Sequence, residues 1–425
     1  MTILPGFVTG GARGLVRRGT DRTGPRARSY TRGVIYLDHA ATSPLHPAAR
    51  RALLAGLDQV GNASSLHAAG RAARRTVEES REALAAALSA RPSDIVFTSG
   101  GTEADNLAVK GLYWARRAAD PARRRVLVSA VEHHAILDPA LWLAEHEGAE
   151  LVLLPVDRDG VLDLQALHDE LDAHGDAVAL ISVMWANNEV GAVQPVAEVV
   201  EAARRHGIPV HADAVQAVGQ LPVDFAASGL DAMTVTGHKV GGPIGAGALL
   251  ARRGLGLVPV QHGGGQERGV RSGTLSAPLL AAFAAAAQAA VDEREPFATR
   301  VAELRDRLVA GVRAQVPGAV LRGPADPARR LPANAHLTFA GCEGDSLLYL
   351  LDSAGVAVST GSACRAGVPQ PSHVLLAMGL SDDEARGALR FSLGHTTTDD
   401  DIDAALRALP AVVERARAAG LAVLA

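Results

Sequence analysis

Lys239 is the reactive side chain whose position says most about this sequence. It is one of only two lysines among 425 residues, since 40 of the 42 basic residues are arginine. Arginine replaces lysine where only a positive charge is needed, but it cannot form a Schiff base. Lys239 follows the apolar run Ala232–Thr236 and precedes a glycine-rich turn. It is therefore a candidate for amine chemistry, the alternative being a surface lysine that happens to follow a strand.

Asp213 directly follows another expected strand, Ile208–Ala212, and lies 26 residues before Lys239. A carboxylate in that position needs a cationic partner. A protonated pyridine nitrogen is one such partner, and the pairing turns the ring into an electron sink. Gln216, one turn later, is placed to donate to a ring oxygen. The alternative for Asp213 is an N-cap of the following helix.

A phosphate site is suggested by Gly101 and Thr102, between an expected strand, Asp94–Thr98, and a helix. Free N–H groups at a helix start attract anions, and the threonine hydroxyl adds a donor. Thr236 and His238, just before Lys239, are placed to donate to the same phosphate. The alternative is a helix N-cap that binds no ligand.

A further candidate is His133, which follows the expected strand Arg125–Ser129. An imidazole there can stack on an aromatic ring or move a proton. The alternative is a structural histidine.

The elements that must position these side chains alternate between strand and helix from about residue 95 to residue 250. This pattern predicts an α/β fold with a mainly parallel, doubly wound sheet, in which ligands bind beyond the carboxyl ends of the strands. The conjunction of a phosphate site, an imidazole, a carboxylate and a lysine at those ends indicates pyridoxal 5'-phosphate, bound as an imine to Lys239. The other expected strands are Glu150–Pro155, Ala177–Met184 and Gly245–Ala251, and the expected helices are Glu103–Arg117, Pro139–Glu147 and Pro195–His206.

A second domain is expected after an alanine-rich stretch, Leu275–Arg300, which predicts one long helix. We predict a large domain over residues 34–290, whose first residues (about 12) pack on a small C-terminal domain over residues 291–425. Residues 1–33 carry seven arginines against one acid and are predicted to be a disordered extension, with a transit peptide as the alternative. The small domain is expected to contain Ala335–Phe339, the helix Gly344–Ala354, Val356–Ser359, Arg386–Leu393 and the helix Asp399–Ala419.

The bulk composition excludes several classes of protein. No apolar run reaches the length of a membrane helix, and the net charge of −4 gives no general attraction to nucleic acid. Two cysteines cannot form a disulfide framework, so we expect a cytoplasmic protein in a reducing compartment. We expect no metal site and no direct contact with nucleic acid or membrane.

In the order of its motifs, the chain resembles cysteine desulfurases, which are NifS/IscS-like members of the class V aminotransferase group of fold-type I pyridoxal-phosphate enzymes. The likeness runs from Tyr36 almost to the C-terminus. The motifs that carry it are Tyr36–Thr42, Gly61–His67, Thr98–Asn106, Glu132–His134, Asn187–Gly191, His211–Gln216, Thr236–Lys239, His262–Arg268, Arg271–Thr274, Thr360–Cys364 and Arg390–Gly394.

The resemblance implies roles around the cofactor ring. Lys239 would carry the imine and shuttle protons, and Asp213 would pair with the pyridine nitrogen. His133 would stack on the ring, while Asn188 and Gln216 would face the ring hydroxyl or the substrate.

The resemblance also implies which residues bind the cofactor phosphate and which bind the substrate carboxylate. Gly101, Thr102, Thr236 and His238 would hold the phosphate, with glycine where the family commonly has alanine at 101 and threonine where it commonly has serine at 236. Thr274 would reach the phosphate of a neighbouring subunit, which implies a homodimer. Arg390 would bind the substrate carboxylate by a bidentate pair.

Cys364 would define the reaction, because the resemblance implies that its thiolate takes the sulfur of L-cysteine as a persulfide and leaves L-alanine. Sulfur would then pass to an iron-sulfur scaffold or a tRNA-thiolating acceptor protein. The loop after Cys364 is slightly shorter than in the best-known forms, which leaves that partner open. Selenocysteine lyase and class V aminotransferase activity are the alternatives on this fold. Cys342 is expected to be a buried structural thiol.

Overall fold

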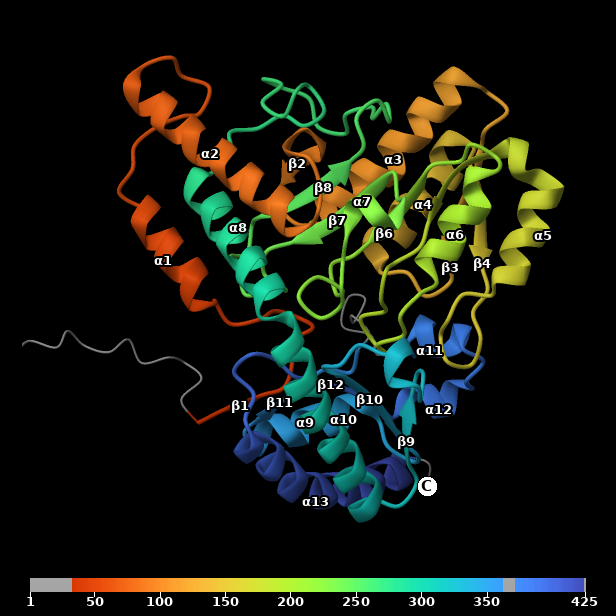
Figure 1. Cartoon of the computed structure of the whole chain (residues 1–425). Helices are drawn as coiled ribbons and strands as arrows, with labels where there is room; N and C mark the ends of the chain where they lie inside the picture. The colour runs from red at the N-terminus through yellow and green to blue at the C-terminus, as the bar shows by residue number, and fades with distance from the viewer. Residues whose placement is uncertain (1–32, 362–370, 424–425) are drawn as a thin grey trace, which may run out of the picture. The chain divides into compact units, whose positions relative to one another are not determined.

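The computed structural model describes residues 33–361 and 371–423. Its centre is a seven-stranded sheet in the order β2-β8-β7-β6-β5-β3-β4 (Figure 1). Within it, β8 is antiparallel to both neighbours and the other strands share one direction, as predicted. The strands are β2 (Ile95–Thr98), β3 (Arg125–Ser129), β4 (Glu150–Leu154), β5 (Val178–Ser182), β6 (Val210–Asp213), β7 (Ala232–Thr236) and β8 (Gly247–Ala251).

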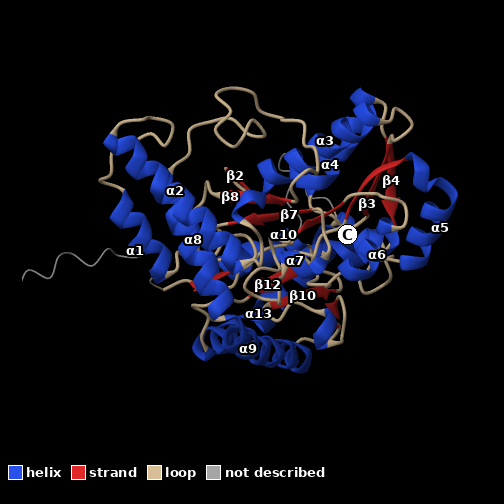
Figure 2. Ribbon diagram, turned by 45° about the horizontal axis from the view of Figure 1, so that its top comes forward, coloured by secondary structure: helices blue, strands red, loops and turns tan. Residues whose placement is uncertain are grey.

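Helices cover both faces of this sheet, and Figure 2 shows the red strands between blue helices. Alternate residues of one strand enter different cores: Leu127 packs in the core that includes α2 and α8, whereas Val126 and Val128 pack against α3 and α4. Burial on both faces explains why the strands are almost continuously apolar. The helices around the sheet are α1 (Pro47–Gly56), α2 (Ala68–Ala87), α3 (Gly101–Ala119), α4 (His134–Glu147), α5 (Leu164–His174), α6 (Val196–Arg204), α7 (Phe225–Ser228) and α8 (Ala277–Asp292).

A separate apolar core lies in the C-terminal part of the chain. It is built on the antiparallel sheet β12-β10-β9 and also contains Leu37, because β1 pairs in parallel with β11. The N-terminal segment therefore packs against residues more than 300 positions away. The elements are β1 (Ile35–Tyr36), α9 (Arg294–Gln315), β9 (Ala319–Arg322), β10 (Asn334–Phe339), α10 (Gly344–Ser353), β11 (Val356–Ala357), α11 (His373–Ala377), α12 (Asp382–Arg386), β12 (Ala388–Ser392) and α13 (Asp399–Val423).

The prediction of one helix over Leu275–Arg300 is wrong. The chain forms two helices, α8 and α9, which meet at Glu293 with φ −92° and ψ 1°. Helix propensity continues across this point, but α8 packs in the core of the large sheet and α9 in the C-terminal core. Tertiary packing on two cores therefore overrides the local preference for one straight helix.

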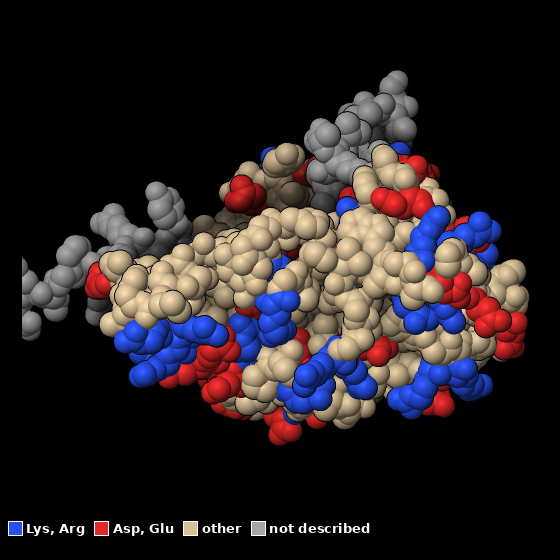
Figure 3. Space-filling view, turned by 90° about the horizontal axis from the view of Figure 1, so that it is seen from above, with Lys and Arg blue, Asp and Glu red and all other residues tan. Residues whose placement is uncertain are grey.

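The surface carries mixed charge. On the face shown in Figure 3, basic and acidic side chains lie side by side and form no field of a single sign. None of the described helices is long and apolar enough to cross a membrane. The predicted extension over residues 1–33 falls almost entirely outside the described residues, and the boundary between residues 290 and 291 stays a prediction.

Candidate active site

A cavity of about 390 Å³ lies beyond the carboxyl ends of the parallel strands. The ends of β6 and β7 and the start of α3 contribute to its wall, as expected for a doubly wound sheet. Most of the site residues predicted from the sequence come together here. They are Gly101, Thr102, His133, Asn188, Asp213, Gln216, Thr236, His238, Lys239 and Arg390.

The Lys239 amine is held by backbone carbonyls of the N-terminal segment. Its Nζ donates to the Ala40 oxygen at 2.5 Å and to the Ala41 oxygen at 2.8 Å. Burial and then the charge of Arg390 lower its pKa to about 8. The amine therefore reaches its neutral, nucleophilic form far more easily than an ordinary lysine.

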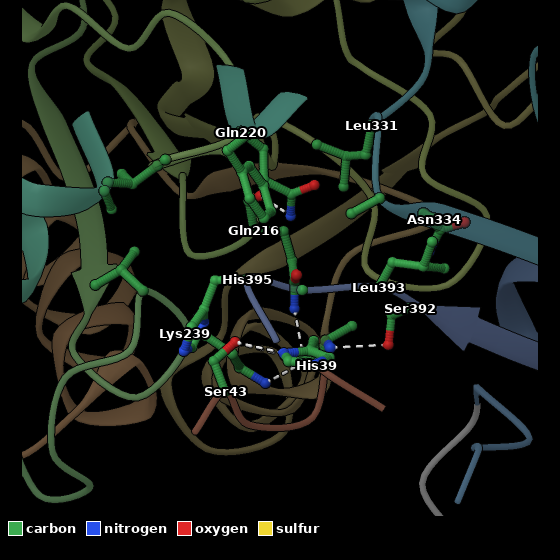
Figure 4. Close-up of a pocket in the computed structure, with 18 of the residues that line it drawn as sticks. His39, Ser43, Gln216, Gln220, Lys239, Leu331, Asn334, Ser392, Leu393 and His395 are labelled. Atoms are coloured by element: carbon green, nitrogen blue, oxygen red, sulfur yellow. Dashed lines mark hydrogen bonds between the residues drawn. The ribbon is translucent and has the colours of Figure 1, made fainter. Parts of the chain in front are cut away.

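A smaller cavity of about 80 Å³ adjoins the first one and also reaches Lys239. Figure 4 shows Gln216 and Ser392 approaching the segment that contacts this lysine. Gln216 donates to the Ala40 oxygen at 3.0 Å, and Ser392 accepts from the Ala40 nitrogen at 2.9 Å. The Ala40 peptide is thus fixed from both sides, which fixes the acceptors of the amine.

Asp213 is the last residue of β6 and is 7% exposed. Its Oδ1 accepts from the Val215 nitrogen at 2.8 Å, and Oδ2 has no hydrogen-bond partner among the described residues. Burial raises the pKa of this carboxyl to about 6. A cationic ring nitrogen at Oδ2 would satisfy the free oxygen and favour the ionised form.

A buried polar layer, which the sequence analysis missed, lies next to Asp213. His211 binds Ser182 at 2.9 Å through Nδ1 and Thr234 at 3.0 Å through Nε2. Burial lowers the pKa of His211 to about 3, so this imidazole is neutral. Asp105 lies 3.8 Å from His211 Nε2, and burial followed by the charge of Asp213 raises its pKa well above the usual range. The available signal was spacing, since Asp105 follows Gly101 by one helical turn.

The start of α3 provides an anion site. No side chain in the described part of the chain caps this helix, so the N–H groups of its first turn have no capping partner there, and Gly101 and Thr102 of that turn line the cavity. A Cβ at Gly101 would lie 3.1 Å from Val215 Cγ2, so the turn is tightly packed. Thr236 and His238 face the same space, and burial and the charge of Lys239 lower the pKa of His238 to about 4. The N–H groups at the helix start, the Thr236 hydroxyl and the neutral His238 ring can all donate hydrogen bonds to a phosphate.

His133 caps α4, since its Nδ1 accepts from the Ala135 nitrogen at 3.1 Å. The proton of the neutral ring must therefore lie on Nε2. Burial and the charge of Lys239 lower the pKa of His133 to about 4. A neutral imidazole with one fixed N–H donor thus lies in the cavity wall.

Arg390, on β12, is 4% exposed and oriented by two partners. It donates through Nη2 to Asp38 at 2.9 Å and through Nη1 to the Asn188 carbonyl at 3.0 Å. Its Nε is buried and has no partner among the described residues. The guanidinium is therefore held in place, and each Nη keeps a second N–H for an anionic substrate group.

Of the other predicted residues, two lie outside this cavity and one is not described by the structure. Thr274 is exposed in the segment before α8 and does not line the cavity. Cys364 lies outside the described residues, but Ser359, Gly361 and His373, which flank its segment, line the cavity. Cys342 is buried in the C-terminal core, which confirms the expectation.

These residues fit pyridoxal phosphate. An amine with a lowered pKa, a buried carboxylate with a free oxygen and an uncapped helix start occupy separate parts of the cavity wall, as an aldehyde, a pyridine nitrogen and a phosphate require. The described ranges contain no cluster of side chains that could hold a metal ion.

Known proteins resemble this chain over most of its length. The Aminotransferase class-V family model matches residues 35–405. The IscS-like cysteine desulfurase of Mycobacterium tuberculosis is 59% identical over 387 residues, which cover 91% of this chain and 98% of that protein. A solved NifS-like protein has a TM-score of 0.82 at 32% identity and covers 90% of this chain and 100% of its own. The structure of SspA in complex with cysteine has a TM-score of 0.72 at 31% identity, with coverages of 84% and 98%.

Proposed function

The chain belongs to the class-V aminotransferase family and is a pyridoxal-phosphate-dependent cysteine desulfurase. We propose which of its residues carry out each part of the conversion of L-cysteine to L-alanine. The observation that carries the proposal is that Lys239, Asp213 and Arg390 line one cavity. When bound, the cofactor supplies an electron sink that stabilises negative charge at the substrate Cα.

Lys239 would hold the cofactor, and its free amine can move protons. The Ala40 and Ala41 carbonyls hold that amine at the cavity wall. With a pKa of about 8, the amine can take the Cα proton and later return a proton to carbon. Asp213 would keep the ring nitrogen protonated, and the neutral His133 would pack on the ring without adding charge.

Arg390 binds the carboxylate of L-cysteine. Its partners Asp38 and Asn188 fix the plane of the guanidinium before substrate enters, and the second N–H of each Nη is left to donate to the substrate. Because the guanidinium of Arg390 is already oriented, it loses little entropy when it binds, so it favours substrates that carry an α-carboxylate.

The Cys364 thiol takes the sulfur. One enzyme thiol and one L-cysteine give one enzyme persulfide and one L-alanine. The C–S bond of the substrate breaks, an S–S bond forms, and the substrate Cβ keeps the electron pair and gains a proton. No external oxidant is required. The position of Ser359 and Gly361 in the cavity wall supports this role for the segment that follows them.

We extend the proposal to assembly and location. A homodimer, in which Thr274 serves the phosphate of the other subunit, is supported by exposed apolar side chains on α1, between α1 and α2, and after Lys239, namely Leu54, Leu57, Val60, Leu66 and Ile244. The sulfur would go to an acceptor protein for iron-sulfur cluster assembly or tRNA thiolation in the cytoplasm. The two apolar cores support a large domain over 34–290 and a small domain over 291–425.

The test measures alanine and sulfide together after incubation of the purified holoenzyme with L-cysteine and a reductant. Lys239→Ala should lose both products and the imine absorbance. Cys364→Ala should lose sulfide release and keep the absorbance, whereas Cys342→Ala serves as the matched control and should keep both. Sulfide release by Cys364→Ala at the wild-type rate would overturn the role of that thiol, and a yellow Lys239→Ala variant with an unchanged band would overturn the role of Lys239.

A further inference from the structure

Four histidines line the active-site cavity: His133, His134, His238 and His373. His238 lies beside the phosphate donors, and the hydrogen bonds of the other three decide which of them can accept a proton. In a neutral imidazole one nitrogen carries a proton and the other a free lone pair. The partner of each ring therefore shows where its lone pair lies.

His133 is a poor base. The lone pair of its Nδ1 already accepts the Ala135 N–H, so the proton lies on Nε2. The ring can offer a hydrogen-bond donor to the cavity. It can take up a second proton only by giving up the cap of α4.

His373 has the opposite arrangement. Its Nε2 lies 2.9 Å from the backbone oxygen of Glu132, and a carbonyl oxygen can only accept. The proton therefore lies on Nε2, and the lone pair on Nδ1 is free of partners among the described residues. His373 thus presents a base held in a fixed tautomer.

His134 lies against it, with ring centroids 5.1 Å apart and planes tilted by 57°. Its Nδ1 is 3.0 Å from Oδ1 of Asp138, so Nδ1 donates and the lone pair lies on Nε2. The side chains of His134 and Asp138 are both partly exposed. His134 and Asp138 therefore connect the cavity wall with solvent.

The charges around His373 come from several elements. Glu189 is buried and accepts a hydrogen bond from Ser372, but burial outweighs that bond and the charges of His373 and Arg390, so the pKa of its carboxyl is raised. The buried Glu132 precedes α4, and burial raises the pKa of its carboxyl well above the usual range. Lys239 and Arg390 line the same cavity as His373 and Glu189. The partly exposed carboxylate beside the two rings is Asp138, 3.0 Å from Nδ1 of His134, which offers a proton a route to solvent.

We propose that Nδ1 of His373 accepts the thiol proton of the L-cysteine substrate and that His134 exchanges it with solvent. The S–H bond breaks, an N–H bond forms on His373, and the sulfur keeps the electron pair. The proton then leaves through His134 and Asp138. The inference rests on the proposed desulfurase function and assigns the base for its substrate thiol.

The test uses the holoenzyme with His373→Gln, because a glutamine amide can still donate to the Glu132 carbonyl but is no base. One assay is the single-turnover rate of alanine formation from L-cysteine across pH 6 to 9. The second is deuterium exchange at Cα of L-alanine in D₂O, which needs Lys239 and involves no thiol. His146→Gln is the matched control, since His146 lies on α4 and stacks on Trp142.

The variant should form alanine about 10²- to 10⁴-fold more slowly, with a weaker loss of rate toward acid pH, and should exchange L-alanine at the wild-type rate. His146→Gln should behave as wild type in both assays. An unchanged single-turnover rate in His373→Gln would overturn the proposal, and so would a parallel loss of both activities, which would indicate a positional role. Failure of the wild-type enzyme to exchange L-alanine would instead overturn the assignment of Lys239.

Discussion

Lys239 of the apo-protein should react with an amine-directed reagent at neutral pH far faster than an ordinary lysine. Burial and the charge of Arg390 lower its pKa from 10.5 to about 8. At pH 7 the neutral fraction is then about 9%, against about 0.03% for an unperturbed amine, a difference of roughly 300-fold. Restricted access lowers the absolute rate but does not change the pH at which the rate levels off.

The composition makes this assay unusually clean. Since Lys110 is the only other lysine, two peptides report every lysine modification, and mass spectrometry separates them. We expect the Lys239 rate to rise up to about pH 8 and then to level off. Arg390→Gln should move that midpoint to higher pH because a repelling charge is removed, and Asp213→Asn should move it lower because an attracting charge is removed.

One result would refute this reasoning. If the Lys239 rate rises tenfold per pH unit up to pH 10, the amine is an ordinary exposed lysine. The burial and the neighbouring charge would then have no influence on its chemistry. Lys110→Arg serves as the control that assigns the signal.

Three further predictions concern stability. Glu267→Gln should lower the free energy of unfolding by about 3–5 kcal/mol in chemical denaturation, because it leaves the Arg81 charge buried and without its bidentate partner at 2.7 and 2.8 Å. Glu78→Gln is the control, since the exposed Glu78 pairs with the same arginine. A loss below about 1 kcal/mol for Glu267→Gln would contradict the stabilising role of the buried pair. Gly394→Ala should lower the free energy of unfolding by about 1–3 kcal/mol, since its Cβ would clash with the ring of the buried His39. Adding His39→Ala to this variant should recover part of the loss. Additive losses in the double variant would rule out this contact. Burial lowers the pKa of His39 to about 3, so as the pH drops below about 6.5 the unfolded chain takes up this proton before the folded chain does, and stability falls. In His39→Phe the slope of the unfolding free energy against pH, measured from pH 6.5 to 5, should be smaller by up to about 1.4 kcal/mol per pH unit. An unchanged slope would exclude His39 as a cause.

Most of the catalytic wall was predictable because its chemistry follows strand ends. The predicted strands Arg125–Ser129 and Ala232–Thr236 have the same bounds as β3 and β7. Parallel strands place their carboxyl ends at one edge of a sheet, so residues just after them meet without further information. This is why Asp213 and Lys239 share a cavity.

Other features depend on how distant elements pack. The layer of Asp105 and His211 depends on a helix packing across two strands, and the break at Glu293 depends on two separate cores. The tautomer of His373 depends on a carbonyl 241 residues away in the chain. Each of these features is a contact between elements, which propensity and periodicity do not encode.

By itself, the sequence determined the alternation of strands and helices, the shortage of lysine that singles out position 239, and the residue types at the strand ends. Only the tertiary structure decided how those groups are tuned. The Asp38–Arg390 pair joins residues 352 positions apart, and the Ala40 and Ala41 carbonyls reach Lys239 from the N-terminal segment, about 200 positions away. Charge, burial and hydrogen-bond direction act through space, so the pKa of an amine or the lone pair of an imidazole is fixed only when distant segments pack together.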